Sequence, residues 1–198
     1  MSQQSSTDDQ RSAAPLPHAE SWVSSQPLEL ESGGRLSEVT VCFETWGTLD
    51  PDRQNAVLIC HALSGDSHVA RHSADDDPGW WEVLVGPGKP IDTDHYYVIC
   101  SNVLGGCRGT TGPNFIDPSS GRPFGADFPI ITVRDMVDVQ IRLLDHLEID
   151  RAFVSGNSLG GNVVWRLMMD HPERLLGVIQ AGPGSPIAVS HISVKTIE

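Results

Sequence analysis

The fold is decided by the stretch Ala152-Phe153-Val154-Ser155-Gly156-Asn157-Ser158-Leu159-Gly160-Gly161. A short apolar run is followed by the pattern G-x-S-x-G around Ser158 and then by a segment with helical spacing. The pattern alone is a weak signal, but a strand before it and a helix after it are the context of a serine nucleophile held on a sharp turn. Gly156 and Gly160 would let the strand and the helix approach closely. The alternative is an ordinary glycine-rich turn in which Ser158 caps the helix.

Around this turn, apolar runs alternate with segments of helical spacing. Helices are expected over residues 132–147 and 160–169, the first with Thr132 as its N-cap and Asp135 as an acidic partner. Short continuous apolar runs are typical of strands buried on both faces of a parallel sheet. We therefore predict right-handed βαβ units, with strands at Ala56 to Cys60, Tyr96 to Cys100, Ala152 to Val154 and Leu176 to Ala181.

The N-terminal part predicts a different kind of pairing. Leu28 to Leu30 and Glu38 to Glu44 are expected to form an antiparallel hairpin around the turn at residues 32–34. In the second of these strands, apolar and polar residues alternate, which is the pattern of a half-buried strand. Residues 1–20 are rich in Ser and Gln and are expected to be a disordered leader, so the folded domain would cover residues 21–198. A short strand at 192–197 is a further expectation.

Composition excludes several classes of function. The 198 residues are 39% hydrophobic and 20% charged, as in an ordinary soluble domain, and the net charge is -13. Phosphate backbones and anionic lipids would be repelled by such a surface. No apolar run is long enough to span a bilayer and no secretory signal begins the chain. We therefore expect a cytoplasmic protein that binds neither nucleic acid nor membrane.

The four cysteines are expected to be reduced thiols, because nothing in the sequence indicates export. Cys60 and Cys100 end strand-like runs, where buried thiols are expected. A metal site is not predicted: the only adjacent Cys and His are Cys60 and His61, which would point to opposite faces of a strand.

An oxyanion hole is expected beside Ser158. One donor would be the backbone N–H of Leu159 at the start of the helix, and the second would be that of Leu63, in the segment that follows the strand ending at Cys60. His61 is a candidate general base, but on a fold of this kind the triad runs Ser, Asp or Glu, then His. We therefore expect the His61 ring to brace the oxyanion loop.

With these motifs placed, the sequence resembles the homoserine O-acetyltransferase family, over about residues 28–181. The run Ser101 to Pro113 is the most specific match. The other matching segments are Phe43 to Gly47, Asn55 to Gly65, Asp66 to Ala70, Pro78 to Trp81, Gly86 to Lys89, Ile91 to Thr93, Tyr97 to Ile99, Gly125 to Val137 and Gly156 to Gly161.

The resemblance implies an α/β-hydrolase-type, mostly parallel sheet with an antiparallel N-terminal hairpin. It also implies ping-pong transfer of an acyl group from acetyl-CoA to Ser158 and then to the hydroxyl of L-homoserine, with acetyl-CoA as co-substrate and no bound cofactor. Other readings stay open: a succinyl-CoA-dependent or L-serine acyltransferase, a plain serine esterase, or an inactive truncated form. The expected partners are the small-molecule substrates, with a homodimer as an open alternative.

CoA is anionic, so local positive charge is expected in spite of the acidic total. Arg71, Lys89 and Arg108 lie in the long loops 62–94 and 102–128, and Arg108 is our candidate for substrate binding. The alternative for each is a solvated surface cation. The aromatic side chains of these loops are expected either to wall a dry acyl pocket or simply to pack in the core.

The sequence departs from the family in two ways. Asn157 stands where the family more often has Gly, and Asn162-Val163 where it usually has Met-Gln. After Ala181 the match stops, so the family's lid, its substrate-binding arginine and the acid and base of the triad are not in this chain. His191 comes too early to be that base. We therefore expect a sheet truncated before the lid and the last strands, and without its base Ser158 is a poor nucleophile.

Overall fold

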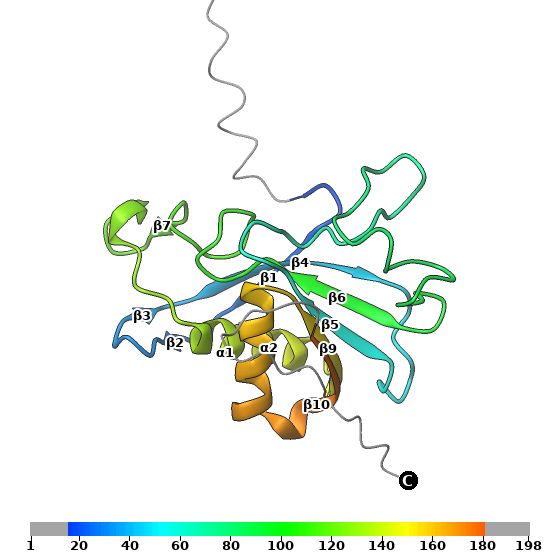
Figure 1. Ribbon diagram of the computed structural model, residues 1–198. Coiled ribbons are helices and arrows are strands. Elements are labelled where there is room, and N and C mark those ends of the chain that lie inside the picture. The colour runs from blue at the N-terminus through cyan, green and yellow to red at the C-terminus, as the bar shows by residue number, and fades with distance from the viewer. Residues whose placement is uncertain (1–15, 181–198) are drawn as a thin grey trace, which may run out of the picture.

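The structure is a computed structural model that describes residues 16–180, which are built around a central six-stranded sheet (Figure 1). The strand order is β1-β4-β6-β5-β9-β10. The strands are β1 (Glu20–Ser24), β4 (Val39–Trp46), β5 (Ala56–Cys60), β6 (Tyr97–Ser101), β9 (Ala152–Gly156) and β10 (Leu175–Gln180). The last four in chain order are mutually parallel, β4 pairs antiparallel with β6, and β1 pairs antiparallel with β4. The predicted mostly parallel α/β sheet is confirmed.

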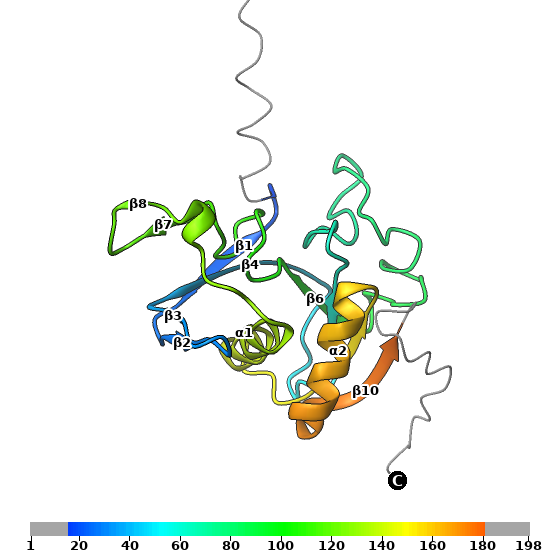
Figure 2. The ribbon, with the colours of Figure 1, turned by 60° about the vertical axis from the view of Figure 1, so that its left-hand side comes forward.

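The direction of the chain decides which layer covers each face of the sheet. From β6 to β9 and on to β10 the chain moves one way along the sheet, so right-handed crossovers place α1 (Val133–His146) and α2 (Leu159–Asp170) on the same face (Figure 2). The step from β5 to β6 runs the other way, and its connection lies on the opposite face. The strand residues alternate accordingly: Leu58 belongs to the hydrophobic cluster under the helices, and Ile59 to a second cluster with Trp80.

The start of α1 is fixed by a capping box. The Thr132 hydroxyl accepts a hydrogen bond from the Asp135 N–H, and the Asp135 carboxylate accepts one from the Thr132 N–H at 2.7 Å. Asp135 also accepts from the N–H of Glu31 at 2.9 Å, which ties the helix to the N-terminal hairpin. The predicted cap is confirmed, and it has this second role because the Asp135 side chain is buried.

The hairpin prediction was wrong in its second strand. β2 (Leu28–Glu29) pairs with β3 (Arg35–Leu36) around a turn closed by the Leu30 N–H and the Gly34 carbonyl. The segment predicted as its partner is β4, which instead joins the main sheet between β1 and β6. The turn residues were identified correctly, but two residues of pairing suffice for this hairpin, and the longer apolar strand is used in the core.

The polar positions of β4 were also expected to face solvent, and they do not. Cys42 and Glu44 are both buried. The cause is the loop after β6: the Thr110 hydroxyl accepts from the Cys42 N–H at 2.9 Å, and the Thr111 hydroxyl accepts from the Thr40 N–H at 2.8 Å. Long loops therefore cover a face that a simple alternation pattern would leave to water.

The remaining elements are short and lie in or beside the predicted long loops. They are β7 (Ile116–Asp117), β8 (Arg122–Pro123) and the 3-10 helices η1 (Gly125–Asp127) and η2 (Pro172–Arg174). Among residues 16–180, no helix combines the length and the apolar character needed to cross a membrane. Most of the predicted leader, all of segment 192–197 and His191 lie outside the described residues, whereas Glu20 begins β1.

Candidate active site

Ser158 occupies a strained position between the end of β9 and the first residue of α2. Its φ is 51° and its ψ is -118°, a conformation that costs a residue with a Cβ about 1–3 kcal/mol. Its side chain makes no capping hydrogen bond to α2, and the residue is exposed. The turn therefore presents a hydroxyl to solvent: Ser158 holds the N-cap position of α2, as the alternative interpretation expected, but its side chain does not cap the helix.

Two glycines make this turn sterically feasible, as the sequence predicts. A Cβ on Gly160 would collide with the carbonyl oxygen of Cys60. A Cβ on Gly156 would lie 2.5 Å from the carbonyl oxygen of Gly160, closer than real Cβ atoms approach other atoms. The first turn of α2 is consequently packed directly on the end of β5.

The turn lies at a switch point of the sheet. Cys60 and Gly156 are register partners at the ends of the neighbouring parallel strands β5 and β9. The chain leaves β5 toward the loop-covered face and leaves β9 toward the helix-covered face. In open α/β sheets, ligands bind outside the carboxyl ends of strands at such a point. Ser158 and the segment 61–65 both lie there.

The two predicted oxyanion donors are brought to this same edge. Leu159 is the first residue of α2, so its N–H has no acceptor within the helix. Leu63 lies in a turn closed by the Gly65 N–H and the Ala62 carbonyl at 2.9 Å, and its side chain is 77% exposed. Within residues 16–180 neither amide donates a hydrogen bond, so both are available to a ligand.

His61 braces the loop. Its Nε2 accepts from the N–H of Val103 at 3.3 Å, so its Nδ1 carries the proton and donates to the Ala62 carbonyl at 2.6 Å. Burial lowers the pKa of His61, against a smaller raising effect of the Ala62 carbonyl. The ring is therefore neutral at pH 7, and both of its nitrogens are occupied within the loop region, as expected of a brace rather than a base.

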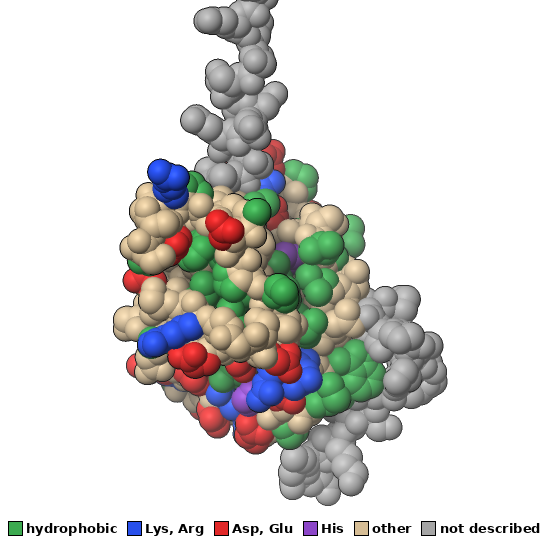
Figure 3. Space-filling view, turned by 90° about the vertical axis from the view of Figure 1, so that its left-hand side faces the viewer, with side chains coloured by type: hydrophobic (Ala, Val, Ile, Leu, Met, Phe, Trp, Pro, Cys, Tyr) green, Lys and Arg blue, Asp and Glu red, His purple; other side chains and the backbone are tan. Residues whose placement is uncertain are grey.

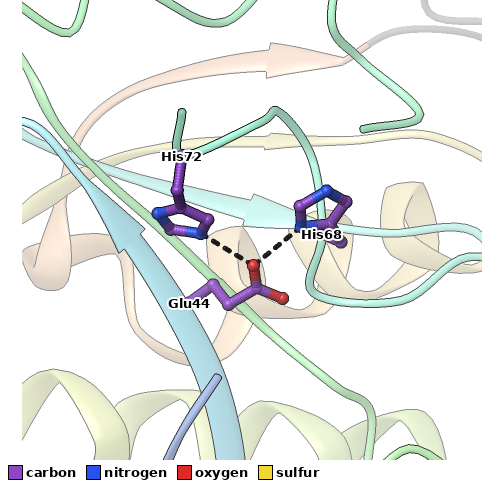
Figure 4. A group of neighbouring side chains, drawn as sticks. All are labelled: Glu44, His68 and His72. Atoms are coloured by element: carbon purple, nitrogen blue, oxygen red, sulfur yellow. Dashed lines mark hydrogen bonds and ion pairs between the residues drawn. The ribbon is translucent and has the colours of Figure 1, made fainter. Parts of the chain in front are cut away.

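A cluster of polar groups around the buried Glu44 lies just beyond segment 61–65, the segment that carries Leu63 (Figure 4). The Glu44 carboxylate, fully buried on β4, accepts from the Ser67 hydroxyl at 2.7 Å, from His68 Nδ1 at 2.9 Å and from His72 Nε2 at 2.8 Å. Asn102 joins the cluster, because its Oδ1 accepts from the Ser67 N–H at 2.9 Å. The cluster links the loop after β5 to β4 and to the residue that follows β6.

Sequence reasoning missed this cluster. The ligand atoms of Glu44, His68 and His72 lie within 4.8 Å of one another, a grouping in which a metal ion could be held. Each already takes part in a hydrogen bond, and the group is explained as a hydrogen-bonded network. The one signal in the sequence was Glu44 itself, a carboxylate between the apolar residues of a strand.

The predicted cations are engaged with neighbouring carboxylates. Lys89 Nζ is 2.8 Å and Arg71 Nε is 3.3 Å from Glu82 Oε1. Partial burial acts to raise the pKa of Glu82, but the bonds from Lys89 and from the backbone N–H groups of Arg71 and Gly79 outweigh it and lower the pKa to about 2. Arg108 Nε is 3.9 Å from Asp66 Oδ2, close to segment 61–65.

The loop aromatics pack mainly against the core. Trp80 and Trp81 join the cluster on the loop-covered face, and Phe124 and Phe128 pack against the one under the helices. Phe115, together with Phe124, lines a cleft of about 640 Å³ between β3, the start of β4 and the β7 region. Figure 3 shows hydrophobic side chains in the middle of the side of the molecule that carries β3 and β7. Ser158 is not among the residues that line this cleft.

Comparison with known proteins agrees with this architecture. The family model described as the alpha/beta hydrolase fold matches residues 55–195. A homoserine O-acetyltransferase of Symbiobacterium thermophilum is 52% identical over 180 residues, which are 86% of this chain and 47% of that protein. One of Methanosphaerula palustris is 46% identical over 195 residues, 95% of this chain and 40% of that protein. The chain therefore spans less than half the length of these relatives.

Solved structures give the same result. The crystal structure of a homoserine O-acetyltransferase from Bacillus anthracis has a TM-score of 0.74 and 36% identity, covering 82% of this chain and 46% of that one. An esterase structure has the same TM-score and identity and covers 82% of this chain and 48% of its own. The chain belongs to the α/β-hydrolase fold family and is similar, over most of its own length, to homoserine O-acetyltransferases.

Proposed function

We propose that the full-length protein containing this chain transfers an acetyl group from acetyl-CoA to the hydroxyl of L-homoserine, through an acetyl ester on Ser158. The thioester carbonyl is attacked by the Ser158 oxygen and CoA leaves as its thiol. The homoserine hydroxyl then attacks the ester, releasing O-acetylhomoserine and restoring the Ser158 hydroxyl. In the full-length protein this is a step of methionine biosynthesis, carried out in the cytoplasm.

The observation that carries the proposal is the strained turn at Ser158, at the switch point of the sheet. There the free N–H groups of Leu63 and Leu159 would stabilise the oxyanion of each tetrahedral intermediate, a contribution worth about 10²–10³ in rate for one donor. The identity of 43–56% to proteins named homoserine O-acetyltransferase, or named for methionine biosynthesis, supports the choice of substrates.

Ser158 also needs a general base. Among the described residues its hydroxyl makes no hydrogen bond to a histidine, and His61 is occupied in bracing the loop. The proposed activity therefore requires a histidine supplied from outside residues 16–180, with an acidic partner. Arg108 is the proposed contact for an anionic part of the substrates.

Ester hydrolysis is the second candidate, because an esterase of 36% identity shares the fold over 82% of this chain. The two activities differ only in what attacks the acyl-enzyme: water or an amino-acid hydroxyl. Exclusion of water would favour transfer.

The test is to mix the full-length protein with acetyl-CoA and to locate the added acetyl group by peptide mass spectrometry. Acetylation of Ser158 that disappears on addition of L-homoserine, with formation of O-acetylhomoserine, is the expected result. Succinyl-CoA and L-serine, tested in place of each substrate, define donor and acceptor. Loss of the ester at the same rate with and without L-homoserine would favour the esterase.

Two variants control this experiment. Ser158→Ala should abolish labelling and turnover, whereas Ser120→Ala, which removes an exposed hydroxyl in the β7–β8 loop, should change neither. Unchanged turnover in Ser158→Ala would remove Ser158 from the mechanism.

A further inference from the structure

The segment that carries Leu63 is held at both of its ends. Upstream, His61 is bound to the Val103 N–H at 3.3 Å, in the loop after β6. Downstream, the Ser67 N–H donates to Asn102 Oδ1 at 2.9 Å and the Ser67 hydroxyl donates to Glu44 at 2.7 Å. Leu63 lies between these anchors, and in its own turn the only backbone bond is that of Gly65 to Ala62. The position of the Leu63 amide therefore depends on the anchors.

The downstream anchor centres on one carboxylate. Both oxygens of Glu44 are used: Oε1 by Ser67, and Oε2 by His68 and His72. A fully buried carboxylate is costly unless it is paired and hydrogen-bonded. These three donors come from one stretch of loop, residues 67–72, so the stabilisation of Glu44 and the fixing of the loop are the same set of contacts.

The protonation of His68 follows from its neighbours. Its Nε2 lies 2.9 Å from the Asp77 carbonyl, which can only accept, so Nε2 carries a proton. Its Nδ1 faces Glu44 Oε2 at 2.9 Å, and a hydrogen bond there needs a second proton on the ring. Burial acts to lower the pKa of His68, but the Asp77 carbonyl, Glu44 and Asp76 together raise it above its ordinary value. An imidazolium at His68 balances the buried Glu44 charge.

The groups around this pair are consistent with that charge balance. His72 faces Glu44 with Nε2 and stacks on Trp46 with ring centroids 4.7 Å apart. Asp76 Oδ2 is 3.8 Å from His68 Nε2 and accepts from the His72 N–H. His18 approaches the other Asp76 oxygen at 3.6 Å. The pair of Glu44 and His68 lies deepest, with side-chain exposures of 0% and 13%.

We propose that Glu44 is a positioning residue for acyl transfer: its hydrogen bonds hold segment 61–67, and with it the Leu63 amide, at the Ser158 end of the sheet. Glu44 does not touch the reacting atoms. This inference rests on the proposed function, and it adds a buried carboxylate on β4 to the groups on which the oxyanion hole depends. Misplacement of a reacting or stabilising group by about 1 Å can cost about 10² in rate.

The experiment measures how fast Ser158 reacts with an alkyl fluorophosphonate in the full-length protein. In that reaction the Ser158 oxygen bonds to phosphorus, fluoride leaves, the serine proton passes to the general base, and the phosphoryl oxygen occupies the oxyanion hole. Glu44→Gln keeps the size of the side chain but replaces an acceptor by an N–H donor that faces other donors. We expect its labelling rate at Ser158 to fall about tenfold or more, and that of Ser67→Ala to fall less.

The matched control is Gln140→Leu. Gln140 makes an equally buried pair with Ser101, with Oε1 and Nε2 each within 3.0 Å of the Ser101 hydroxyl, on the helix-covered side of the sheet. The Gln140→Leu variant should lose about as much free energy of unfolding as Glu44→Gln, but its labelling rate at Ser158 should stay within about twofold of that of the wild type. Labelling of folded Glu44→Gln and Ser67→Ala at the control's rate would overturn the proposal. If Glu44→Gln does not fold by circular dichroism, Ser67→Ala decides alone.

Further readouts separate the remaining explanations. If the wild-type protein is not labelled at Ser158, the proposed function fails and this inference fails with it. If the wild-type protein is labelled and the Glu44 and Ser67 variants are labelled equally fast, only this inference is refuted. In steady-state turnover the Glu44→Gln change should lower kcat and leave the KM for L-homoserine within about threefold. The zinc content of the purified protein is also measured. One zinc ion per protein molecule, lost in Glu44→Gln, would show that a metal rather than a proton joins His68 to Glu44, and this result would also overturn the proposal.

Discussion

The carbonyl oxygen of Cys60 lies directly against the Cα of Gly160, so the end of β5 and the first turn of α2 are in backbone contact. An alanine at position 160 would push the helix away from the strand. We expect Gly160→Ala to lower the free energy of unfolding by about 1–3 kcal/mol and to slow acylation of Ser158, measured by urea denaturation and by labelling. Asn162→Ala, in the same turn of α2, is the control and should change the free energy by less than about 0.5 kcal/mol.

The backbone strain at Ser158 predicts a gain of stability when the side chain is removed. Ser158→Gly should raise the free energy of unfolding by about 1 kcal/mol, because glycine adopts a φ of 51° without steric cost. Ser158→Ala keeps the Cβ and should leave stability near that of wild type. Both variants should be inactive. Equal stability of the two, by thermal and chemical denaturation, would mean that the turn is not strained.

The thiols should differ sharply in reactivity. Cys42, Cys60 and Cys100 are buried and Cys107 is exposed. Burial raises the pKa of Cys60 to about 12, and thiolates are the reactive form. Titration of the native protein with a disulfide reagent should modify one thiol quickly, and Cys107→Ser should remove that phase. Rapid modification of two or more thiols in the native state would contradict the described packing.

Glu82 should make stability depend on acid pH. Its folded pKa of about 2 lies below the ordinary value of 4.5, so its contribution is present above pH 4.5 and is lost as the pH falls from 4.5 toward 2. Glu82→Gln should therefore lose about 1–2 kcal/mol at pH 7, and the difference from wild type should shrink as the pH falls over that window. Glu29→Gln, which breaks an exposed pair with Arg35, should show little difference at any pH.

The elements that the sequence predicts best are those whose burial is decided locally. Ala56–Cys60 is apolar throughout because a layer covers each face of its strand, and the Thr132 cap is followed by its acidic partner within one turn. β1 was not expected, because Glu20, Ser21 and Val23 are exposed and leave no apolar run, and its pairing with β4 is decided by the sheet and not by its own sequence.

The candidate site divides in the same way. Ser158, Leu159 and Leu63 are candidates from the sequence because each lies two or three residues after the end of a strand whose apolar run is visible. Glu44 could not be named in this way, because its partners His68 and His72 are 24 and 28 residues away and only the chain path through the sheet brings them together. The burial of Glu44 depends on loops, whose course carries no periodic pattern to predict.

The unequal covering of the two faces of the sheet has a consequence for the order of folding. On one face, α2 joins the neighbouring parallel strands β9 and β10, and the pairing of Ala152 with Leu175 closes over a short length of chain. On the other face the cover is loop, fastened by contacts such as that of the Cys42 N–H with the Thr110 hydroxyl, 68 residues apart, which require a long chain segment to be closed first. Non-local contacts of this kind slow folding. We expect the helix-covered face to form first and the face that carries the Leu63 segment to consolidate last. The oxyanion hole would then be completed only after the sheet and its helices have formed.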